Sequence, residues 1–366
     1  ANTFGNMPSQ QAILQSVYDG LLLPMDRAGK VETRQFIRVL QDPTARSMLR
    51  TLFFSLQECQ KGARRPKDVP RFEVKKVGVI GAGLMGQGIA HVTAKAKIDV
   101  VLIDRDLASA ERGKHKVAKT LERRLKKGRT TPDRIEAILS RIHPSESYDE
   151  LRGCDVIVEA VFEDRELKAK VTKAADAQLG DNAIFASNTS GLPITGLAKA
   201  SSRPANFIGL HFFSPVERMQ MVEIVVGEET SQETLAKAWD YILAIKKAGI
   251  VVNDSPGFYT SRVFGTFISE GNHLLVEGVR PALIENAAKA AGMPMPPLGI
   301  SDQVGLGTMY KVAKQAERDA AAAGEKWAPS PAQAIIASLI EDHDRWGAYP
   351  PPKEDGSQRT PCLLYT

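Results

Sequence analysis

The sequence contains little cysteine, and this scarcity excludes several kinds of protein. Its three cysteines, Cys59, Cys154 and Cys362, lie far apart in the chain. They are too few for the disulfide framework of a small secreted protein, and they lack the paired spacing of a zinc site. Five of the six histidines also stand without metal-ligand spacing. We therefore expect no bound metal, and we expect a cytoplasmic protein whose thiols stay reduced.

Long apolar runs and an apolar leader are also absent. No stretch approaches the roughly 20 consecutive apolar residues that a membrane-spanning helix needs. The first ten residues, ANTFGNMPSQ, are polar and lack the basic-then-apolar pattern of a secretion signal. The formal net charge of +5 is a mild excess, and no basic run is interleaved with aromatic residues. We therefore expect binding to neither membrane nor nucleic acid, whereas a small acidic ligand such as a coenzyme phosphate is compatible with this charge.

The chain changes its pattern along its length. Apolar residues recur at helical spacing in the first part, which ends in a basic, proline-containing linker. Short β-branched runs and helical stretches then alternate, and beyond Asn253 the strand signal stops. The end of the chain is rich in proline and polar residues, which is typical of disorder. The predicted parts are a helical segment with linker over 1–71, a domain of alternating strands and helices over 72–253, a helical domain over 254–349 and a disordered tail over 350–366.

The second part predicts an α/β fold. Strands that alternate with helices are typical of a parallel sheet covered by helices on both faces. We therefore expect a Rossmann-type doubly wound parallel sheet, with an N-terminal helical linker and a C-terminal all-helical domain. The predicted strands are Val77–Ile80, Ile98–Ile103, Val156–Val158, Ile184–Ala186, Ile208–Leu210 and Val222–Val226.

A glycine motif follows the first predicted strand and opens a helix. In this context G-x-G-x-x-G indicates a dinucleotide-binding turn, whereas the motif without it would be weak evidence. Gly81 permits the tight turn, Gly83 lets the backbone approach a pyrophosphate, and Gly86 lets the helix pack on the strand. The free N–H groups at the start of the helix then hold the phosphates. We place Leu84 and Met85, which complete the motif, among the cofactor-binding residues.

Asp104 ends the second predicted strand, 21 residues after Gly83. This is the spacing of the acid that accepts the adenine-ribose hydroxyls in such domains. A carboxylate there would repel the 2′-phosphate of NADP, so we expect NAD as the cofactor. The neighbouring Arg105 is the residue type that can accommodate that phosphate, and it leaves some room for NADP.

With these residues in view, the sequence resembles the L-3-hydroxyacyl-CoA dehydrogenase family from about Phe72 to Gly307. The first 70 residues are similar to the segment that links an enoyl-CoA hydratase module to the dehydrogenase module in multifunctional β-oxidation proteins. The resemblance implies an acyl-CoA substrate, and a chain that forms homodimers or packs against other modules. The motifs that carry it are Ser187-Asn188-Thr189-Ser190, Gly209-Leu210-His211-Phe212-Phe213-Ser214-Pro215, Met221-Val222-Glu223-Ile224-Val225, Ser255-Pro256-Gly257-Phe258 and Asp302-x-Val304-Gly305-Leu306.

His211 and Glu223 are the candidate catalytic pair. Oxidation of a secondary alcohol needs a base near neutral pH, which histidine provides. His211 is expected in a loop after the strand 208–210, at the carboxyl edge where such sheets bind ligands. Glu223 falls inside an apolar run, where a carboxylate needs a partner. Such residues are often only structural. The resemblance, however, assigns His211 the role of general base and Glu223 that of its orienting partner.

The resemblance also assigns roles to three further residues. Ser190 matches a serine that hydrogen-bonds the substrate oxygen, although on chemistry alone the Asn-Thr-Ser-Gly stretch could also supply a turn or helix-cap residue there. Glu163 and Lys168 match positions around the nicotinamide ribose, although they could also belong to an exposed, charged helix start. Two positions depart from the family pattern, because Ser214 and Ser261 stand where the family often has asparagine.

Three functions remain open at the level of sequence. The first is NAD-dependent oxidation of (S)-3-hydroxyacyl-CoA to 3-ketoacyl-CoA in fatty-acid β-oxidation. The second is oxidation of a different hydroxy acid on the same fold, and dependence on the CoA moiety would distinguish the two. The third is a module that binds cofactor but is catalytically impaired, a possibility raised by Ser214 and Ser261. Normal NADH binding without turnover would indicate the third.

Overall fold

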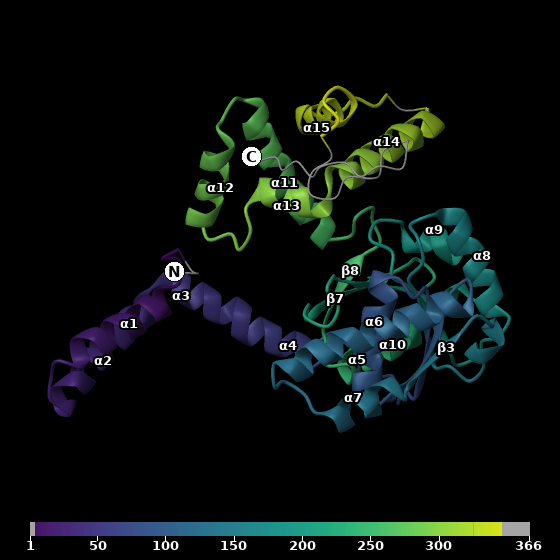
Figure 1. The fold of residues 1–366 in the computed structure, drawn as a ribbon, viewed down its shortest axis with the longest axis horizontal. Helices are drawn as coiled ribbons and strands as arrows, with labels where there is room; N and C mark the ends of the chain where they lie inside the picture. Colours follow the sequence, from purple (N-terminus) through teal and green to yellow (C-terminus); the bar gives the residue numbers. More distant parts are fainter. Residues whose placement is uncertain (1–3, 325, 346–366) are drawn as a thin grey trace. The chain divides into compact units, whose positions relative to one another are not determined.

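The computed structural model describes residues 4–324 and 326–345 (Figure 1). The tail predicted over 350–366 therefore lies outside the described residues. The described residues divide into two compact units, one comprising 51–261 and the other 4–50 together with 262–324 and 326–345. Within the described residues, none of the helices has the length and apolar character needed to cross a membrane.

Within the described residues, eight strands of the unit 51–261 form one sheet in the order β3-β2-β1-β4-β5-β6-β7-β8. Neighbouring strands pair in parallel except β6 and β7, which are antiparallel. The strands are β1 (Lys76–Ile80), β2 (Asp99–Ile103), β3 (Ile142–Ser145), β4 (Val156–Glu159), β5 (Ile184–Ser187), β6 (Phe207–Phe212), β7 (Met221–Val226) and β8 (Ala248–Asn253).

The predicted Rossmann-type architecture is confirmed, with three differences in the sheet. The β6–β7 connection, residues 213–220, is shorter than the dozen or so residues that a parallel crossover needs, so β7 turns back along β6. Two strands were not predicted. The edge strand β3 contains His143 and Pro144 in place of a β-branched run, and proline is tolerated at a sheet edge. Strand β8 begins with Ala248 and Gly249, so its strand pattern is weak.

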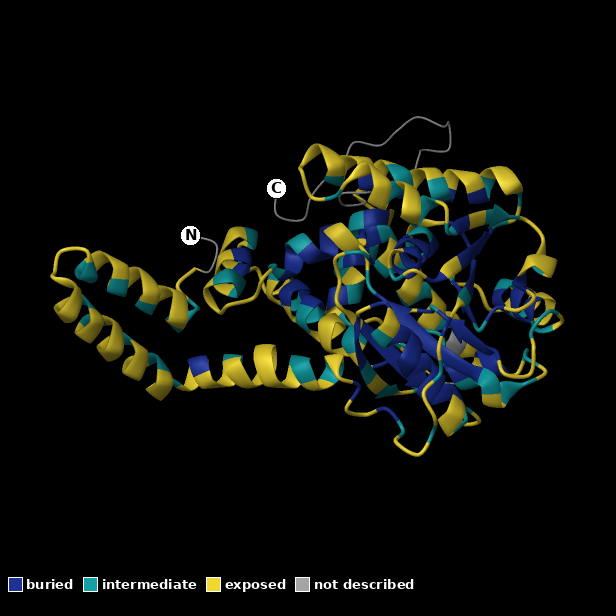
Figure 2. Ribbon diagram, turned by 90° about the horizontal axis from the view of Figure 1, so that it is seen from below, coloured by how far each residue is buried: buried dark blue, intermediate teal, exposed yellow. Residues whose placement is uncertain are grey.

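Helices cover both faces of the sheet and create two apolar layers. Alternate residues of one strand face opposite layers, so Val100 and Leu102 belong to one core and Val101 and Ile103 to the other. Residues of α5, α6 and α10 pack in the first core, and residues of α8 and α9 pack in the second. In Figure 2 the strands of the sheet are coloured as buried, and the helices around them expose their outer faces. These helices are α5 (Leu84–Lys95), α6 (Leu107–Lys126), α8 (Arg165–Asp176), α9 (Ile194–Ala198) and α10 (Gln232–Ala244).

The segment predicted as a linker is fixed to this unit by a buried carboxylate. Asp240 on α10 accepts hydrogen bonds from the Arg65 guanidinium at 2.7 and 2.8 Å, from Arg71 at 2.7 Å and from the Phe72 N–H at 2.9 Å. Arg65 is itself buried. An Arg–carboxylate pair with two parallel bonds is geometrically specific. The chain is therefore anchored where it enters β1.

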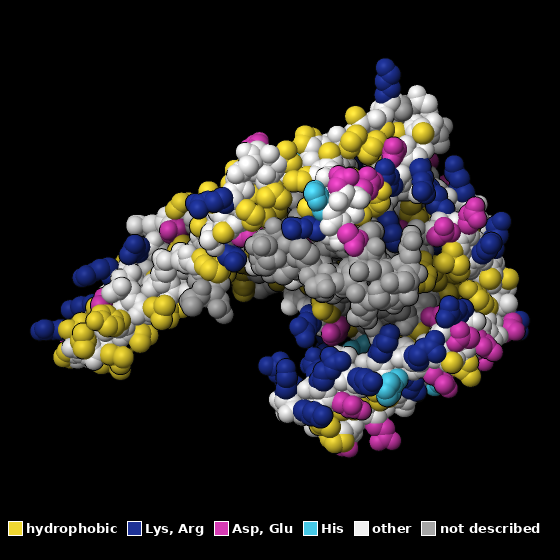
Figure 3. All heavy atoms as spheres, turned by 45° about the horizontal axis from the view of Figure 1, so that its top comes forward, with side chains coloured by type: hydrophobic (Ala, Val, Ile, Leu, Met, Phe, Trp, Pro, Cys, Tyr) yellow, Lys and Arg dark blue, Asp and Glu magenta, His cyan; other side chains and the backbone are white. Residues whose placement is uncertain are grey.

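The other regions are helical, as the sequence pattern predicts. Two helices, α1 and α2, pack against each other as a hairpin whose turn exposes Leu21, Leu22 and Met25 (Figure 3). The remaining helices are α1 (Pro8–Gly20), α2 (Met25–Gln41), α3 (Pro43–Met48), a π-helical stretch η1 (Leu49–Ser55), α4 (Leu56–Gln60), α7 (Pro132–Leu139), α11 (Thr260–Val276), α12 (Pro281–Ala290), α13 (Pro297–Val304), α14 (Leu306–Ala323) and α15 (Pro331–Glu341), with short 3-10 turns η2 (Tyr148–Leu151) and η3 (Pro204–Asn206).

Candidate active site

The three motif glycines of the turn between β1 and α5 have different surroundings, and two of them are required for steric reasons. Gly81 has φ +100°, and a Cβ there would lie 2.6 Å from the Ala160 carbonyl oxygen. A Cβ on Gly86 would lie 1.7 Å from the Gly81 carbonyl oxygen, so the helix could not pack on the turn. Nothing lies within 4 Å of a Cβ built on Gly83, whose backbone is open to an approaching ligand. The turn therefore leaves the backbone at Gly83 open and allows close packing at Gly81 and Gly86.

The start of α5 adds donors to this turn. Gly83 is the N-cap residue and supplies no side-chain hydrogen bond, so the first N–H groups of the helix have no cap from their own terminus. Leu84 is exposed and Met85 half-buried at this point. Such a helix start favours an anion, because unpaired N–H groups and the helix dipole both carry positive charge.

Asp104 lies directly beside the glycine turn. Its Oδ2 accepts a hydrogen bond from the Ala82 N–H at 2.7 Å, and its Oδ1 accepts one from the Arg105 N–H at 2.8 Å. The first bond joins the end of β2 to the turn that follows β1. The Arg105 side chain is turned to Asp106, with Nε 3.1 Å from that carboxylate. A ribose hydroxyl bound next to the turn would thus meet a carboxylate.

His211 and Glu223 form a buried pair across two neighbouring strands. They lie directly opposite each other in the antiparallel register of β6 and β7. His211 Nδ1 lies 2.7 Å from Glu223 Oε2. The expectation of a loop position for His211 was wrong. The strand continues through Phe212 because β7 pairs with it up to that residue. The predicted contact between the two side chains nonetheless forms.

Glu223 is fully buried, and its charge is satisfied by several donors. Oε1 accepts from the N–H groups of Tyr259 and Thr260 at 3.1 and 2.8 Å, and the Thr260 hydroxyl donates to Oε2 at 2.8 Å. Burial raises the pKa of Glu223, but the hydrogen bonds from His211 and Thr260 outweigh it, so this pKa lies below its usual value. The carboxylate is therefore ionised beside the imidazole.

The surroundings of His211 leave one ring nitrogen for chemistry. The His211 side chain is 9% exposed, and its ring lies against Phe213 and Phe258, with ring centroids 4.6 and 5.9 Å away. Because Nδ1 faces Glu223, Nε2 is the nitrogen left to exchange a proton with a ligand.

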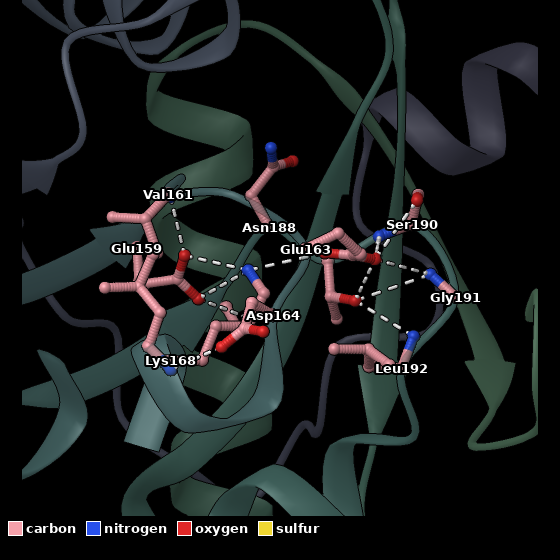
Figure 4. Close-up of polar contacts among 12 residues, drawn as sticks. Glu159, Val161, Glu163, Asp164, Lys168, Asn188, Ser190, Gly191 and Leu192 are labelled. Carbon is pink, nitrogen blue, oxygen red and sulfur yellow. Dashed lines mark hydrogen bonds and ion pairs between the residues drawn. The ribbon is translucent and has the colours of Figure 1, made fainter. Parts of the chain in front are cut away.

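Ser190 is exposed after the end of β5, in a loop that Glu163 organises (Figure 4). Glu163 Oε1 accepts from the Thr189 hydroxyl at 2.6 Å, the Ser190 N–H at 2.8 Å, the Gly191 N–H at 3.1 Å and the Ser190 hydroxyl at 3.2 Å. Burial raises the pKa of Glu163, but the Lys168 ammonium and these hydrogen bonds outweigh it and lower the pKa overall. The loop therefore surrounds a carboxylate that carries its charge.

Lys168 lies behind this loop in a buried ion pair. Its ammonium is 2.9 and 3.0 Å from the two oxygens of Glu159, at the end of β4, and 3.4 Å from Glu163 Oε2. The Lys168 and Glu159 side chains are 2% and 1% exposed. Glu159 also accepts hydrogen bonds from the Ser187 hydroxyl and the Val161 N–H, both at 2.7 Å. Lys168 thus connects Glu159 to the loop that carries Ser190.

Three residues at this site were missed at the level of sequence. Glu159 ends a buried apolar strand, which is the same signal that singled out Glu223. The Asn188 side-chain oxygen accepts a hydrogen bond from the Phe212 N–H at 2.8 Å and so connects the Ser190 loop to the residue after His211. The hydroxyl of Thr260 carried no recognisable sequence signal, because its partner Glu223 is 37 residues away.

Ser214 and Ser261, which stand where the family often has asparagine, differ in their exposure. Ser214 is exposed two residues after the end of β6, and Ser261 is half-buried in the first turn of α11. A serine is shorter than an asparagine and lacks the paired donor and acceptor of an amide. Neither substitution disturbs the 2.7 Å contact between His211 and Glu223.

With this geometry in view, comparison with known families is decisive. A family model described as 3-hydroxyacyl-CoA dehydrogenase, NAD binding domain, matches residues 76–255, and one for the C-terminal domain matches residues 257–343. The chain belongs to this family. The 3-hydroxyacyl-CoA dehydrogenase family and NAD as the cofactor, both predicted from sequence, are thereby confirmed, as is the class of NAD-dependent dehydrogenase.

Individual members of the 3-hydroxyacyl-CoA dehydrogenase family agree with this assignment. The chain is 35% identical to (S)-3-hydroxybutyryl-CoA dehydrogenase PaaH1 from Ralstonia eutropha, with a TM-score of 0.69 over 75% of this chain and 96% of that one. It is 29% identical to the 3-hydroxybutyryl-CoA dehydrogenase of Escherichia coli K12, with a TM-score of 0.69 over 75% of this chain and 58% of that one.

The chain also matches part of a relative that is much longer than itself. The chain is 37% identical to the fatty acid oxidation complex subunit alpha of Shewanella frigidimarina over 318 residues, which is 87% of this chain and 44% of that protein. The chain thus spans about half the length of the curated relatives that it matches.

Proposed function

We propose that this chain oxidises the 3-hydroxyl of an (S)-3-hydroxyacyl-CoA to the ketone, with His211 as general base. The observation that carries the proposal is the buried His211–Glu223 contact of 2.7 Å on strands of the sheet that holds the glycine turn. An ionised carboxylate that orients an imidazole is the arrangement that general-base catalysis needs. Alcohol oxidation uses such a base directly.

The proposed step divides the work between two residues of the dyad. His211 Nε2 accepts the hydroxyl proton of the substrate. Glu223 holds the imidazole through Nδ1 and stabilises its protonated form, because the carboxylate stays ionised in its buried setting. When bound, NAD supplies the acceptor for the hydride that leaves the same carbon. In the reverse direction the protonated His211 returns the proton to the substrate oxygen.

The remaining site residues are proposed to bind and orient. Ser190, exposed and held by Glu163, would hydrogen-bond the substrate oxygen. Glu163 and Lys168 would serve the nicotinamide ribose, Glu163 from the loop and Lys168 from behind it. The adenine half would be bound by the glycine turn and the residues that follow it, namely Gly81, Gly83, Leu84, Met85, Gly86 and Asp104.

The first prediction concerns the substrate. The purified chain should consume NADH rapidly with acetoacetyl-CoA and only slowly with free acetoacetate, measured by the loss of NADH absorbance under matched conditions. The binding energy of the remote CoA moiety is needed for turnover in this proposal. Equal rates with both substrates would favour a different hydroxy-acid dehydrogenase. Saturable NADH binding without turnover would instead mean a module that binds cofactor but is impaired.

A second prediction concerns cofactor choice. Asp104→Ala should weaken NADH binding at least about tenfold, because a hydrogen bond to a charged group is worth about 1.5–3 kcal/mol. Discrimination against NADPH should also fall, since the repelling carboxylate is gone. Fluorescence titration with both cofactors measures the two effects. Asp99→Ala, at the exposed start of the same strand, is the control and should bind both cofactors normally. An unchanged NADH/NADPH ratio would remove Asp104 from the site.

The longer relatives bear on the larger protein in which this chain would act. We propose that it acts as the dehydrogenase portion of a multifunctional fatty-acid oxidation protein, because long curated relatives carry that name and it matches about half of their length. As partners we propose either a second copy of the chain or the remaining modules of such a protein. A cytoplasmic setting suits the isolated cysteines, of which Cys154 is buried and unpaired.

A further inference from the structure

We propose that Thr260 is a positioning residue of the catalytic dyad, whose hydroxyl fixes the Glu223 carboxylate and moderates its hold on protonated His211. This inference rests on the proposed function and extends it to a residue outside the dyad. Thr260 contacts no reacting atom in this proposal. It acts through Glu223.

The geometry gives each oxygen of Glu223 two donors. Oε2 is shared by His211 Nδ1 at 2.7 Å and the Thr260 hydroxyl at 2.8 Å. Oε1 accepts the N–H groups of Tyr259 and Thr260. A carboxylate has about four lone-pair sites, so the fully buried Glu223 is saturated. Its orientation toward His211 is therefore fixed by the donors of Thr260 and Tyr259.

The place of Thr260 in the fold explains the backbone part of this contact. Thr260 is the first residue of α11, where N–H groups have no partner within the helix. Glu223 satisfies two N–H groups there from a strand, and the positive end of the helix favours its negative charge. The backbone donors would remain with any residue at position 260. The hydroxyl is what threonine adds.

The hydroxyl has an effect that its N–H neighbours do not share. It donates to the same oxygen that His211 contacts, so it draws charge from the atom that stabilises the imidazolium. Within the described residues, no other charged side chain forms an ion pair or hydrogen bond with His211 or Glu223. The negative charge on Glu223 Oε2 is therefore shared between the His211 ring and the Thr260 hydroxyl.

The test compares variants that differ in this hydroxyl. Thr260→Val keeps the shape and removes the donor, and Thr260→Ser keeps the donor. For oxidation of a 3-hydroxyacyl-CoA by NAD, in which His211 must start unprotonated, we expect Thr260→Val to move the acid limb of the pH profile of kcat/KM up by roughly half a pH unit, because the carboxylate then holds the imidazolium more strongly. We expect kcat to fall about fivefold, which corresponds to a hydrogen bond of about 1 kcal/mol. Thr260→Ser should restore both.

The controls separate this role from a structural one. Thr266→Val, at an exposed threonine of the same helix, should leave both readouts unchanged. A lower kcat without a shift in the pH profile would overturn the inference, as would a downward shift or no change at all. If Thr260→Val does not fold, as judged by circular dichroism, Thr260→Ala takes its place with the same expectations.

A measurement without turnover distinguishes this inference from the proposed function. The His211 ring protons can be titrated by NMR in the ligand-free wild type and in both variants. Here too the midpoint should rise in Thr260→Val and return in Thr260→Ser. If the wild type were inactive but the midpoint moved in this way, the proposed reaction would fail while the link between Thr260 and the dyad stood. An unmoved midpoint in an active enzyme would overturn the link alone.

Discussion

Replacement of His211 by alanine should lower kcat with acetoacetyl-CoA at least about a hundredfold, which is the usual contribution of a positioned acid–base group. In the proposed mechanism the imidazole exchanges a proton with the substrate, and Glu223 cannot replace it as the base because Glu223 is fully buried. NADH binding should persist, since the glycine turn and Asp104 are untouched. Stopped-flow NADH oxidation and fluorescence titration of NADH measure the two properties on one preparation.

The matched control is His143→Ala, which removes an exposed histidine from the edge strand β3 of the same sheet. It should keep both activity and NADH affinity. Turnover that survived in His211→Ala would mean that another group is the base. Loss of NADH binding together with turnover would point to a damaged fold, and circular dichroism would identify that case before any conclusion about mechanism.

Replacement of Lys168 by methionine should lower the free energy of unfolding by about 3–5 kcal/mol, the usual cost of breaking a buried ion pair from one side. The change would leave the Glu159 carboxylate buried at 1% exposure without its ammonium partner. Urea denaturation followed by circular dichroism, without cofactor, measures the effect. Lys170→Met, at an exposed position of the same helix, should change the free energy of unfolding little.

This prediction also bears on the role proposed for Lys168 at the nicotinamide ribose. A double variant, Lys168→Met with Glu159→Gln, should recover part of the lost stability because no unpaired charge is then buried. If Lys168→Met were as stable as the wild type yet bound NADH weakly, the lysine would act on the cofactor and its pairing with Glu159 would matter little.

Local patterns account for much of the fold. The alternation of apolar runs with helices predicted six strands of the sheet, because the buried strands of a parallel sheet are recognisable from their own residues. The glycine turn was equally local. Gly81 and Gly86 are needed for steric reasons that act within one turn and its neighbours, whereas a Cβ on Gly83 would meet open space. Asp104 followed from its spacing after the turn, because the length of one helix and one strand sets that spacing.

The partners of the charged side chains were harder to predict from the sequence. The pairing of His211 with Glu223 could be inferred because a carboxylate in an apolar run needs a partner. The geometry of this pair could not be inferred, because it requires β7 to run antiparallel to β6, and that direction follows from the short connection 213–220. Glu159 and Lys168 were harder still. An ammonium at a charged helix start has the same sequence signature whether it is exposed or buried.

The sequence by itself thus determined the fold class and the glycine turn with the neighbouring Asp104, since each depends on the pattern within a short stretch of chain. It singled out His211 as the candidate base through a family resemblance. Only the tertiary structure decided which donors each buried carboxylate binds. It placed Lys168 between Glu159 and Glu163, and it brought Thr260 to Glu223 across 37 residues. Such contacts depend on which strands and helix ends become neighbours in the folded chain, and residue order along the sequence does not specify those neighbours locally.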